Sequence, residues 1–304
     1  MTQDNTNKIN RIHFPKWATP YLFVFPIVAV IVLIILYPLG KNISMSFFEN
    51  YLARPLDHDW NNFKNYTDLF KDRFFWNSAK VTGIYISITV VVRFILGFFV
   101  GLLLHQKLRF RGLARALIII PWAIPDVVAC LVWIQMFDFQ YGIINHFLVN
   151  AHLIMEPVDW LSSISLSLPA AMVVNVWKGT SWVAIMILAG LQNIPEDLYE
   201  AAEVDGANSF RKLLNVTIPL LKPVLVSVFL LLIIWSIKDF AIIYILNRGG
   251  PVHATEVMTI YIYQKAFTDL KMGVAAAGGV ILLLTSMLFT VVYLKFLDKG
   301  DDTW

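Results

Sequence analysis

The stretch Asn193-Ile-Pro-Glu-Asp-Leu-Tyr-Glu-Ala-Ala-Glu-Val-Asp-Gly-Ala207 is a polar island between two apolar runs, residues 166–191 and 218–246. Pro195 suits the first turn of a helix, and the acidic residues that follow it are favoured by the positive end of the helix dipole. Gly206 can end that helix, because glycine adopts the left-handed conformation without strain. The pattern predicts a short amphipathic helix displayed on one side of a membrane.

The island continues beyond Ala207 to Pro219, and these residues predict another short helix at an angle to the first. Asn208 or Ser209 can cap it, it extends to Leu214, and Pro219 then opens the next apolar run. Two interpretations are open on physical grounds: an amphipathic loop resting on lipid, or an element on which another protein docks. An acidic first turn would face anionic headgroups unfavourably, which favours docking on a protein.

The composition indicates an integral membrane protein. Hydrophobic residues make up 58% of the 304 residues and charged residues 15%, whereas soluble domains average about 25% charged. A net charge of +3 is too small to indicate nucleic acid as a partner. The single cysteine, Cys130, excludes an internal disulfide and a cysteine-based metal site, and its apolar surroundings predict a small buried side chain. No metal site is expected.

Six runs have the length of about 20 residues that a membrane-spanning helix needs. They cover residues 21–39, 81–104, 113–137, 164–191, 218–246 and 272–297. Helices satisfy the backbone within lipid, and no stretch has the alternation of a barrel strand. The first run is longer than the apolar region of a signal peptide and no cleavage pattern follows it, so a retained first span is expected.

Lysine and arginine cluster in the N-terminal tail, after the second and fourth spans and in the C-terminal tail, which predicts that both termini are cytoplasmic. The expected division is a cytoplasmic tail over 1–18, a first span over 19–40, an extracytoplasmic loop over 41–80, a five-helix core over 81–297 that contains the island loop 192–219, and a C-terminal tail over 298–304. The extracytoplasmic loop is expected to be an amphipathic cap, because 40 residues make a poor independent core.

The third span contains two prolines, Pro121 and Pro125, which remove backbone donors and bend or interrupt the helix. Asp126 follows them, and a carboxylate at that depth must be paired or hydrated. We expect Asp126 or Asp239 to pair with Arg93 or Lys238. Such pairs either fix helix packing or line a cavity, and the sequence leaves both interpretations open.

The island resembles the EAA loop of ABC importer permeases. The resemblance is carried by Glu200-Ala-Ala, Gly206 and the run Val216-Thr-Ile-Pro219. The family pattern for that run is Ile-x-Leu-Pro, and this chain has Val216 in place of the isoleucine and Ile218 in place of the leucine. Further motifs resemble the carbohydrate branch, of maltose/glycerol-phosphate/multiple-sugar type. They are Arg111-Gly-Leu-Ala-Arg, Pro121-Trp-Ala-Ile-Pro, Val176-Trp-Lys-Gly and Asn247-Arg-Gly-Gly-Pro251, in an order that matches over about residues 15 to 297.

The resemblance implies an all-α type I importer permease fold with six transmembrane helices and a cytoplasmic coupling helix, in the bacterial inner membrane. It implies that the island sits in a groove of an ATPase subunit, with contacts from Glu200, Ala201, Ala202, Asp205, Gly206, Ala207 and Phe210. The implied partners are a second homologous permease, an ATPase dimer, an extracytoplasmic solute-binding protein and the sugar itself. The sequence has no P-loop, so ATP and Mg are expected on the ATPase partner, and no cofactor or catalytic residue is expected in this chain.

Sugars need aromatic faces for their C–H surfaces and amides or carboxylates for their hydroxyls. The resemblance places Trp235, Ser236, Asp239 and Phe240 near bound sugar, although the family has asparagines where Ser236 and Asp239 occur here. Trp133, Gln135, Asn175 and Trp177 offer the same chemistry in the third and fourth spans. For the binding protein, the resemblance implies contact with Gly249, Gly250 and Pro251.

Two other classes of function were weighed. A proton-coupled secondary transporter would use Asp126 and Asp239 as a relay, but no inverted repeat occurs and the acidic docking helix argues against it. An intramembrane enzyme would need a catalytic pattern in the spans, such as Ser/His, paired Asp or His-Glu-x-x-His, and none is present.

Overall fold

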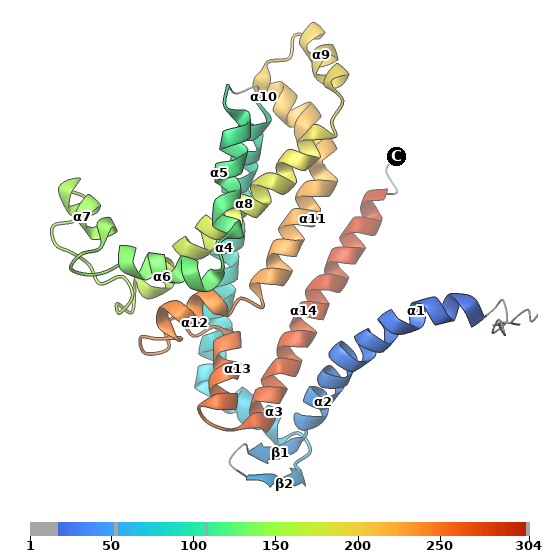
Figure 1. Ribbon diagram of the computed structural model, residues 1–304, viewed down its shortest axis with the longest axis vertical. Coiled ribbons are helices and arrows are strands. Elements are labelled where there is room, and N and C mark those ends of the chain that lie inside the picture. The colour runs from blue at the N-terminus through green and yellow to red at the C-terminus, as the bar shows by residue number, and fades with distance from the viewer. Residues whose placement is uncertain (1–17, 52–53, 107–108, 302–304) are drawn as a thin grey trace, which may run out of the picture.

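A computed structural model describes residues 18–51, 54–106 and 109–301. Most of the predicted N-terminal tail and the last three residues of the predicted C-terminal tail lie outside these ranges. Long helices running roughly side by side form the body, with α9 (Glu196–Val204) at one end and a small hairpin at the other (Figure 1). The expected all-helical membrane fold is confirmed.

Five helical stretches of the described residues are long and apolar enough to cross a membrane. They are Pro20–Met45, Arg73–His105, Ser167–Gln192, Ser209–Ile237 and Met272–Lys295. These stretches contain α1 (Ala18–Val30) with α2 (Tyr37–Met45), α4 (Arg73–His105), α8 (Ser167–Gln192), α10 (Ser209–Lys212) with α11 (Ile218–Ser236), and α14 (Met272–Asp301). Two π-helical turns, Ile31–Leu36 and Leu213–Thr217, join the helices of the first and fourth stretches.

The third predicted span is a broken pair, α5 (Arg111–Ala123) and α6 (Asp126–Met136), bent by 95°. Ile124 and Pro125 adopt extended conformations at the break. Pro125 cannot donate a backbone hydrogen bond and its ring disfavours helical geometry at the residue before it, which ends α5 there. Counted as one span, the pair brings the total to the six expected.

The predicted fifth span, 218–246, begins where α11 begins, but its predicted end is wrong. The continuous helical stretch already starts at Ser209, because the π-helical turn carries α10 directly into α11, and it ends at Ile237. The residues after the break form a separate helix, α12 (Ala241–Asn247). Asp239 therefore lies in the connection between two helices, where its carboxylate can reach the neighbouring α4 and α8.

The core is divided among three clusters of buried side chains. The cluster between α4, α8 and α11 contains Val90, Val183, Ile187, Leu191, Leu221 and Leu232. Gly101 lets α4 and α8 approach closely, since a Cβ there would lie 2.8 Å from Ile187 Cγ2. A second cluster joins α6 and α12, and there the fully buried Cys130 directs its Sγ at the Ile242 carbonyl oxygen at 3.9 Å.

At the end opposite α9, an antiparallel hairpin of β1 (Phe48–Tyr51) and β2 (Arg54–Trp60) precedes α3 (Lys64–Lys71) (Figure 1). Ring contacts join Phe47 to Trp60, Phe63 and Tyr66. The second span begins at Arg73, within the predicted loop 41–80, and Asp72 caps it by accepting a hydrogen bond from Phe74 N. Two further helices complete the chain, α7 (Ile143–Asn150) and α13 (Met258–Phe267).

Candidate functional sites

The island forms α9 as its sequence predicts, but the second predicted short helix is only the start of a long one, because α10 continues through a π-helical turn into α11. Pro195 caps α9, and Gly206 adopts the left-handed conformation with φ +77° after the last turn. The side chain of Asn208 caps α10 by accepting a hydrogen bond from Arg211 N at 2.9 Å. The chain reverses between the two helices because glycine tolerates a backbone geometry that other residues adopt only with strain.

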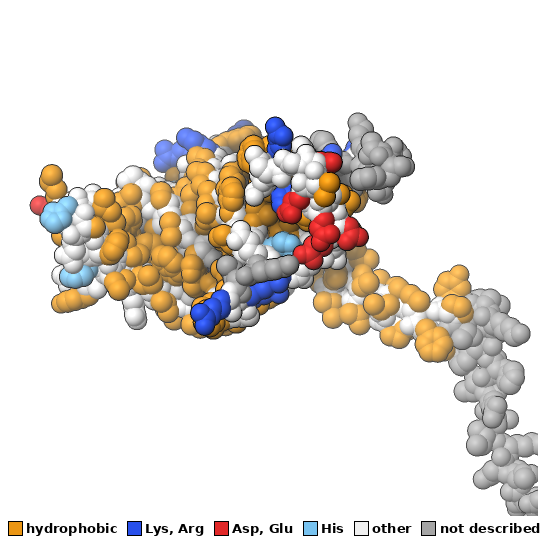
Figure 2. Space-filling view, turned by 90° about the horizontal axis from the view of Figure 1, so that it is seen from above, with side chains coloured by type: hydrophobic (Ala, Val, Ile, Leu, Met, Phe, Trp, Pro, Cys, Tyr) orange, Lys and Arg blue, Asp and Glu red, His pale blue; other side chains and the backbone are white. Residues whose placement is uncertain are grey.

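Nearly all of the predicted coupling residues are accessible at this end of the molecule. Glu200, Ala201, Asp205, Gly206 and Phe210 are exposed, while Ala202 and Ala207 are half-buried. Figure 2 looks onto this end and shows acidic side chains gathered into one patch beside separate basic groups. The helix thus offers a compact acidic and small-residue surface with the Phe210 ring, 66% exposed, beside it.

Two contacts anchor α9 to the helices beneath it. The hydroxyls of Tyr199 and Thr217 lie 3.0 Å apart, and Lys212 Nζ donates to Glu203 Oε1. The hydrogen bond and charge of Lys212 lower the pKa of the Glu203 carboxyl. These contacts tie α9 to the start of the fourth long helical stretch.

A polar cavity of about 460 Å³ lies between the long helices, at the α11–α12 break. Its lining combines charged, amide and aromatic side chains. The residues are Arg93, Trp122, Asp126, Asn175, Lys178, Gly179, Trp182, Leu232, Trp235, Lys238, Asp239, Phe240, Ala241 and Ile242. It thus joins the two kinds of group that a carbohydrate needs.

One ion pair in the cavity is the expected one. Arg93 Nη2 lies 3.4 Å from Asp239 Oδ2, and the same oxygen accepts a hydrogen bond from Asn175 Nδ2 at 2.9 Å. Arg93 also donates to the Ser236 hydroxyl at 3.2 Å. Gly179 leaves room for the guanidinium, because a Cβ at that position would collide with the Arg93 side chain. Three helices therefore meet at one buried polar junction.

Asp126, the alternative acid in that prediction, pairs with neither Arg93 nor Lys238. Its partner is Lys178, whose Nζ lies 3.0 Å from Asp126 Oδ1 and 3.4 Å from the Trp122 carbonyl oxygen. Lys178 thus bridges α8 to both sides of the break between α5 and α6. The carbonyl near a helix break lacks its usual intrahelical donor, and the lysine supplies one.

The predicted substrate residues divide into two groups. Trp235, Asp239, Phe240 and Asn175 line the cavity, and the buried Ser236 holds Arg93 beside it. Trp133 and Trp177 contact each other with ring centroids 5.7 Å apart, and together with Gln135 they lie outside the cavity lining. The sequence prediction missed Trp122, although the motif Pro121-Trp-Ala-Ile-Pro marked the bend that brings it there.

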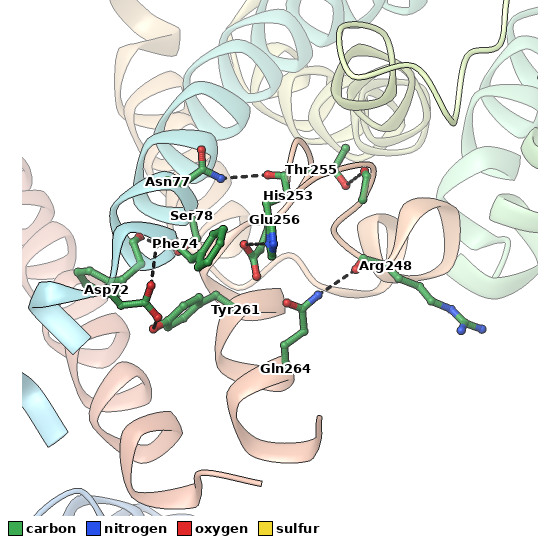
Figure 3. A network of polar contacts seen from close by, with 12 residues as sticks. Asp72, Phe74, Asn77, Ser78, Arg248, His253, Thr255, Glu256, Tyr261 and Gln264 are labelled. Carbon is green, nitrogen blue, oxygen red and sulfur yellow. Dashed lines mark hydrogen bonds and ion pairs between the residues drawn. The ribbon is translucent and has the colours of Figure 1, made fainter. Parts of the chain in front are cut away.

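The loop carrying Gly249, Gly250 and Pro251 follows α12 and is held by a network of polar contacts (Figure 3). The fully buried Glu256 accepts from His253 Nδ1 at 2.7 Å, and Asn77 Nδ2 donates to the His253 carbonyl oxygen at 3.0 Å. Burial raises the pKa of the Glu256 carboxyl, although His253 opposes the shift.

Further contacts tie this loop to the neighbouring helices. Gln264 donates to the Arg248 carbonyl oxygen at 3.1 Å, and Thr255 Oγ1 donates to the Gly250 carbonyl oxygen at 2.7 Å. Val252, at the tip, is 79% exposed. The loop is thus a fixed surface that presents an apolar tip.

The bundle of long apolar helices, its polar cavity and its exposed short helix define a multi-pass membrane transport protein. The family of binding-protein-dependent transport system inner membrane components matches residues 93–300. The chain belongs to this family, which is a family of transport permeases.

Curated relatives match over nearly the whole chain. The trehalose/maltose transport system permease protein MalF of Thermococcus litoralis is 34% identical over 294 residues, covering 96% of this chain and 97% of that protein. The sulfoquinovosyl glycerol transport system permease protein SmoG of Agrobacterium fabrum is 35% identical over 303 residues, covering 97% and 98%.

The fold matches a solved structure at lower identity. A bacterial alginate ABC transporter, solved in complex with an alginate pentasaccharide-bound periplasmic protein, has a chain with a TM-score of 0.77 and 19% identity. The match covers 90% of this chain and 92% of that one. It shows that the two chains share a fold.

Proposed function

We propose that this chain is the membrane-spanning permease subunit of an ABC importer that carries a carbohydrate delivered by an extracytoplasmic binding protein. The observation that carries the proposal is α9, an exposed acidic helix with the Glu-Ala-Ala sequence at one end of a spanning bundle. The chain offers no nucleotide-binding motif, and the helix is tied by Tyr199 and Glu203 to a spanning helix. Movement of α9 by an ATPase partner would therefore alter the bundle.

In this proposal α9 and both chain termini are cytoplasmic, in a bacterial inner membrane. Arg111 at the start of α5 and Arg211 and Lys212 of α10 lie on the same side as α9, as the lysine and arginine bias of cytoplasmic segments requires. The hairpin end and the Gly249–Pro251 loop are then extracytoplasmic. That side is where a binding protein would dock, so Gly249, Gly250 and Pro251 remain the proposed contact.

The proposed assembly contains a second homologous permease and two ATPase subunits that bind ATP and Mg. The first spanning stretch, Pro20–Met45, supports a partner in the membrane, since none of its most apolar window is buried within this chain. It extends from the body as an apolar arm (Figure 2). Lipid or a second permease must cover such a surface, and a paired permease would also complete the cavity.

The carbohydrate class rests on the cavity as well as on the relatives. Trp122, Trp182, Trp235 and Phe240 provide aromatic faces, and Asn175 provides an amide. The curated relatives transport a disaccharide in one case and a sulfoquinovosyl glycerol in the other, as their names state. Both are glycosides. The side chains that line the cavity of this chain bear on which glycoside it carries.

The geometry does not support the alternative function, a stand-alone proton-coupled transporter. Asp239 is held by Arg93 and Asn175, and Asp126 is held by Lys178. A relay carboxylate has to take up and release protons, and a cationic partner keeps it ionised.

Replacement of Glu200 tests the proposal. The chain is co-expressed with its paired permease and ATPase, and co-purification of the ATPase is measured together with ATP-driven uptake in proteoliposomes. Glu200→Ala should reduce both by about tenfold, as expected for loss of a buried interface charge. Asp197→Ala, which removes another exposed carboxylate of α9, is the matched control. Sugar uptake by the purified chain without any ATPase would refute the proposal.

A further inference from the structure

The ionised side chains of the cavity do not balance. Three cations and two carboxylates line it: Arg93, Lys178 and Lys238 against Asp126 and Asp239. Arg93 is paired with Asp239, and Lys178 is paired with Asp126. Lys238 is exposed and forms no ion pair with any other residue that the structure describes. This chain's own lining therefore has one positive charge without a counter-charge.

The unpaired positive charge matters because of the depth at which the cavity lies. Arg93 lies well inside α4, away from both of its ends, so the cavity is at the level of the membrane interior. An open cavity lets water solvate the Lys238 ammonium. When an importer closes around its solute and water is displaced, an uncompensated ammonium at that depth becomes costly. A counter-charge on the solute would remove the cost.

The two existing pairs cannot supply that counter-charge. The Asp239 oxygen nearest Arg93 is also the acceptor for Asn175, and Asp126 already lies 3.0 Å from Lys178. Lys238 and Asp239 are adjacent, yet Asp239 contacts α4 and α8 while Lys238 is exposed and lines the cavity. The lysine is thus presented to whatever enters.

We infer that the solute is an anionic carbohydrate with an acidic group, a carboxylate, sulfonate or phosphate, that Lys238 holds in the cavity. The aromatic faces of Trp122, Trp182 and Trp235 cover the sugar rings, and the ammonium binds the acidic group as a point charge. This inference rests on the proposed function, because it names the substrate class of the proposed transport cavity.

The test uses the complete importer with its binding protein, in proteoliposomes loaded with ATP. The external solution contains a mixture of neutral oligosaccharides from starch and acidic oligosaccharides from pectin and alginate, together with sulfonated and phosphorylated monosaccharide glycosides. Mass spectrometry of the vesicle contents identifies what accumulates. Because the mixture contains carboxylated, sulfonated and phosphorylated sugars, the mass of the accumulated solute shows which acidic group it carries.

Accumulation of an acidic saccharide is expected, and Lys238→Gln should reduce it by about tenfold or more, because an interacting charge is lost. Lys238→Arg should retain most of the uptake. Lys222→Gln removes a lysine near the start of α11, outside the cavity lining, and should leave uptake unchanged. Co-purification of the ATPase with each variant shows that the complex has assembled.

Two results would overturn the inference while leaving the proposed function intact. One is ATP-dependent accumulation of a neutral saccharide, and the other is acidic uptake that Lys238→Gln does not change. Absence of ATP-dependent uptake of every saccharide in the mixture would instead count against the proposed function itself.

Discussion

Arg93 in α4 and Asp239 in the α11–α12 connection lie 3.4 Å apart, and the two side chains are 7% and 29% exposed. The pair joins two segments that are distant in sequence, and Asn175 of α8 shares the same carboxylate oxygen. The break after α11 is what frees Asp239 to make both contacts.

Removal of the Asp239 charge should destabilise the protein. Asp239→Asn leaves the nearly buried Arg93 without a counter-charge, which costs about 3 kcal/mol for a buried pair. Thermal unfolding of the detergent-solubilised protein measures the loss. The double variant R93L/D239L should recover part of it. If the double variant is less stable than either single one, the pair is not the source of the stability.

The second ion pair should matter less for stability. Asp126 is 45% exposed, so solvent screens its attraction to Lys178, and Asp126→Asn should cost about 1 kcal/mol or less. In this variant Lys178 can still donate its hydrogen bond to the Trp122 carbonyl oxygen. The same thermal measurement, made side by side with Asp239→Asn, gives the order of the two effects. A larger loss for Asp126→Asn would show that the bend depends on this pair.

Gly206 should be sensitive to a methyl group for reasons of backbone geometry alone. A Cβ there would have nothing within 4 Å, but φ is +77°. Gly206→Ala therefore introduces strain of about 1 kcal/mol in the α9–α10 turn, and should weaken ATPase co-purification and uptake. Gly112→Ala is the matched control, since it also has open space but no positive φ. Equal effects of the two substitutions would show that the left-handed backbone of the α9–α10 turn is not the cause.

Acidification should weaken the hold of α3, α4 and α13 on one another through Asp72. Burial opposes its ionisation, but hydrogen bonds from Phe74 N, Tyr261 and Lys265 prevail and lower the pKa of the carboxyl below its ordinary value of 3.8. The contribution to stability is complete above that ordinary pKa and is lost as pH falls through the lowered one. Thermal unfolding between pH 2 and pH 6 should therefore show a loss below about pH 4 that is smaller in Asp72→Asn. Equal acid sensitivity in both proteins would contradict this role.

The local features of the chain could be predicted from its sequence. Length and hydropathy locate the spans, and Pro195, Gly206 and Asn208 act on their immediate neighbours, so the short helices at the island follow from a few residues. The two prolines of the third span predict a bend or break as well, although the sequence gives neither its position nor its angle of 95°.

The pairing of Arg93 with Asp239 is among the predicted ones, whereas the partner of Asp126 could not be predicted. Asp126 is paired with Lys178, which is a question of where α8 passes relative to the α5–α6 break, and hydropathy carries no information about it. The end of α11 at Ser236 was missed for a related reason, because the chain continues to Leu246 without proline or glycine and only Lys238 and Asp239 interrupt its apolar residues. Tertiary contacts override local propensity there. The hairpin before α3 depends on ring contacts between residues that hydropathy does not connect.

The burial of Cys130 has a practical consequence. It is the only thiol in the chain, it is fully buried, and its Sγ faces the Ile242 carbonyl oxygen. Thiol reagents should therefore react first with a cysteine introduced at an exposed position such as Val204, which is 89% exposed at the end of α9. The native sequence is thus ready for site-specific spin labels or fluorophores, and distances from α9 could be followed through a transport cycle without first removing a natural cysteine.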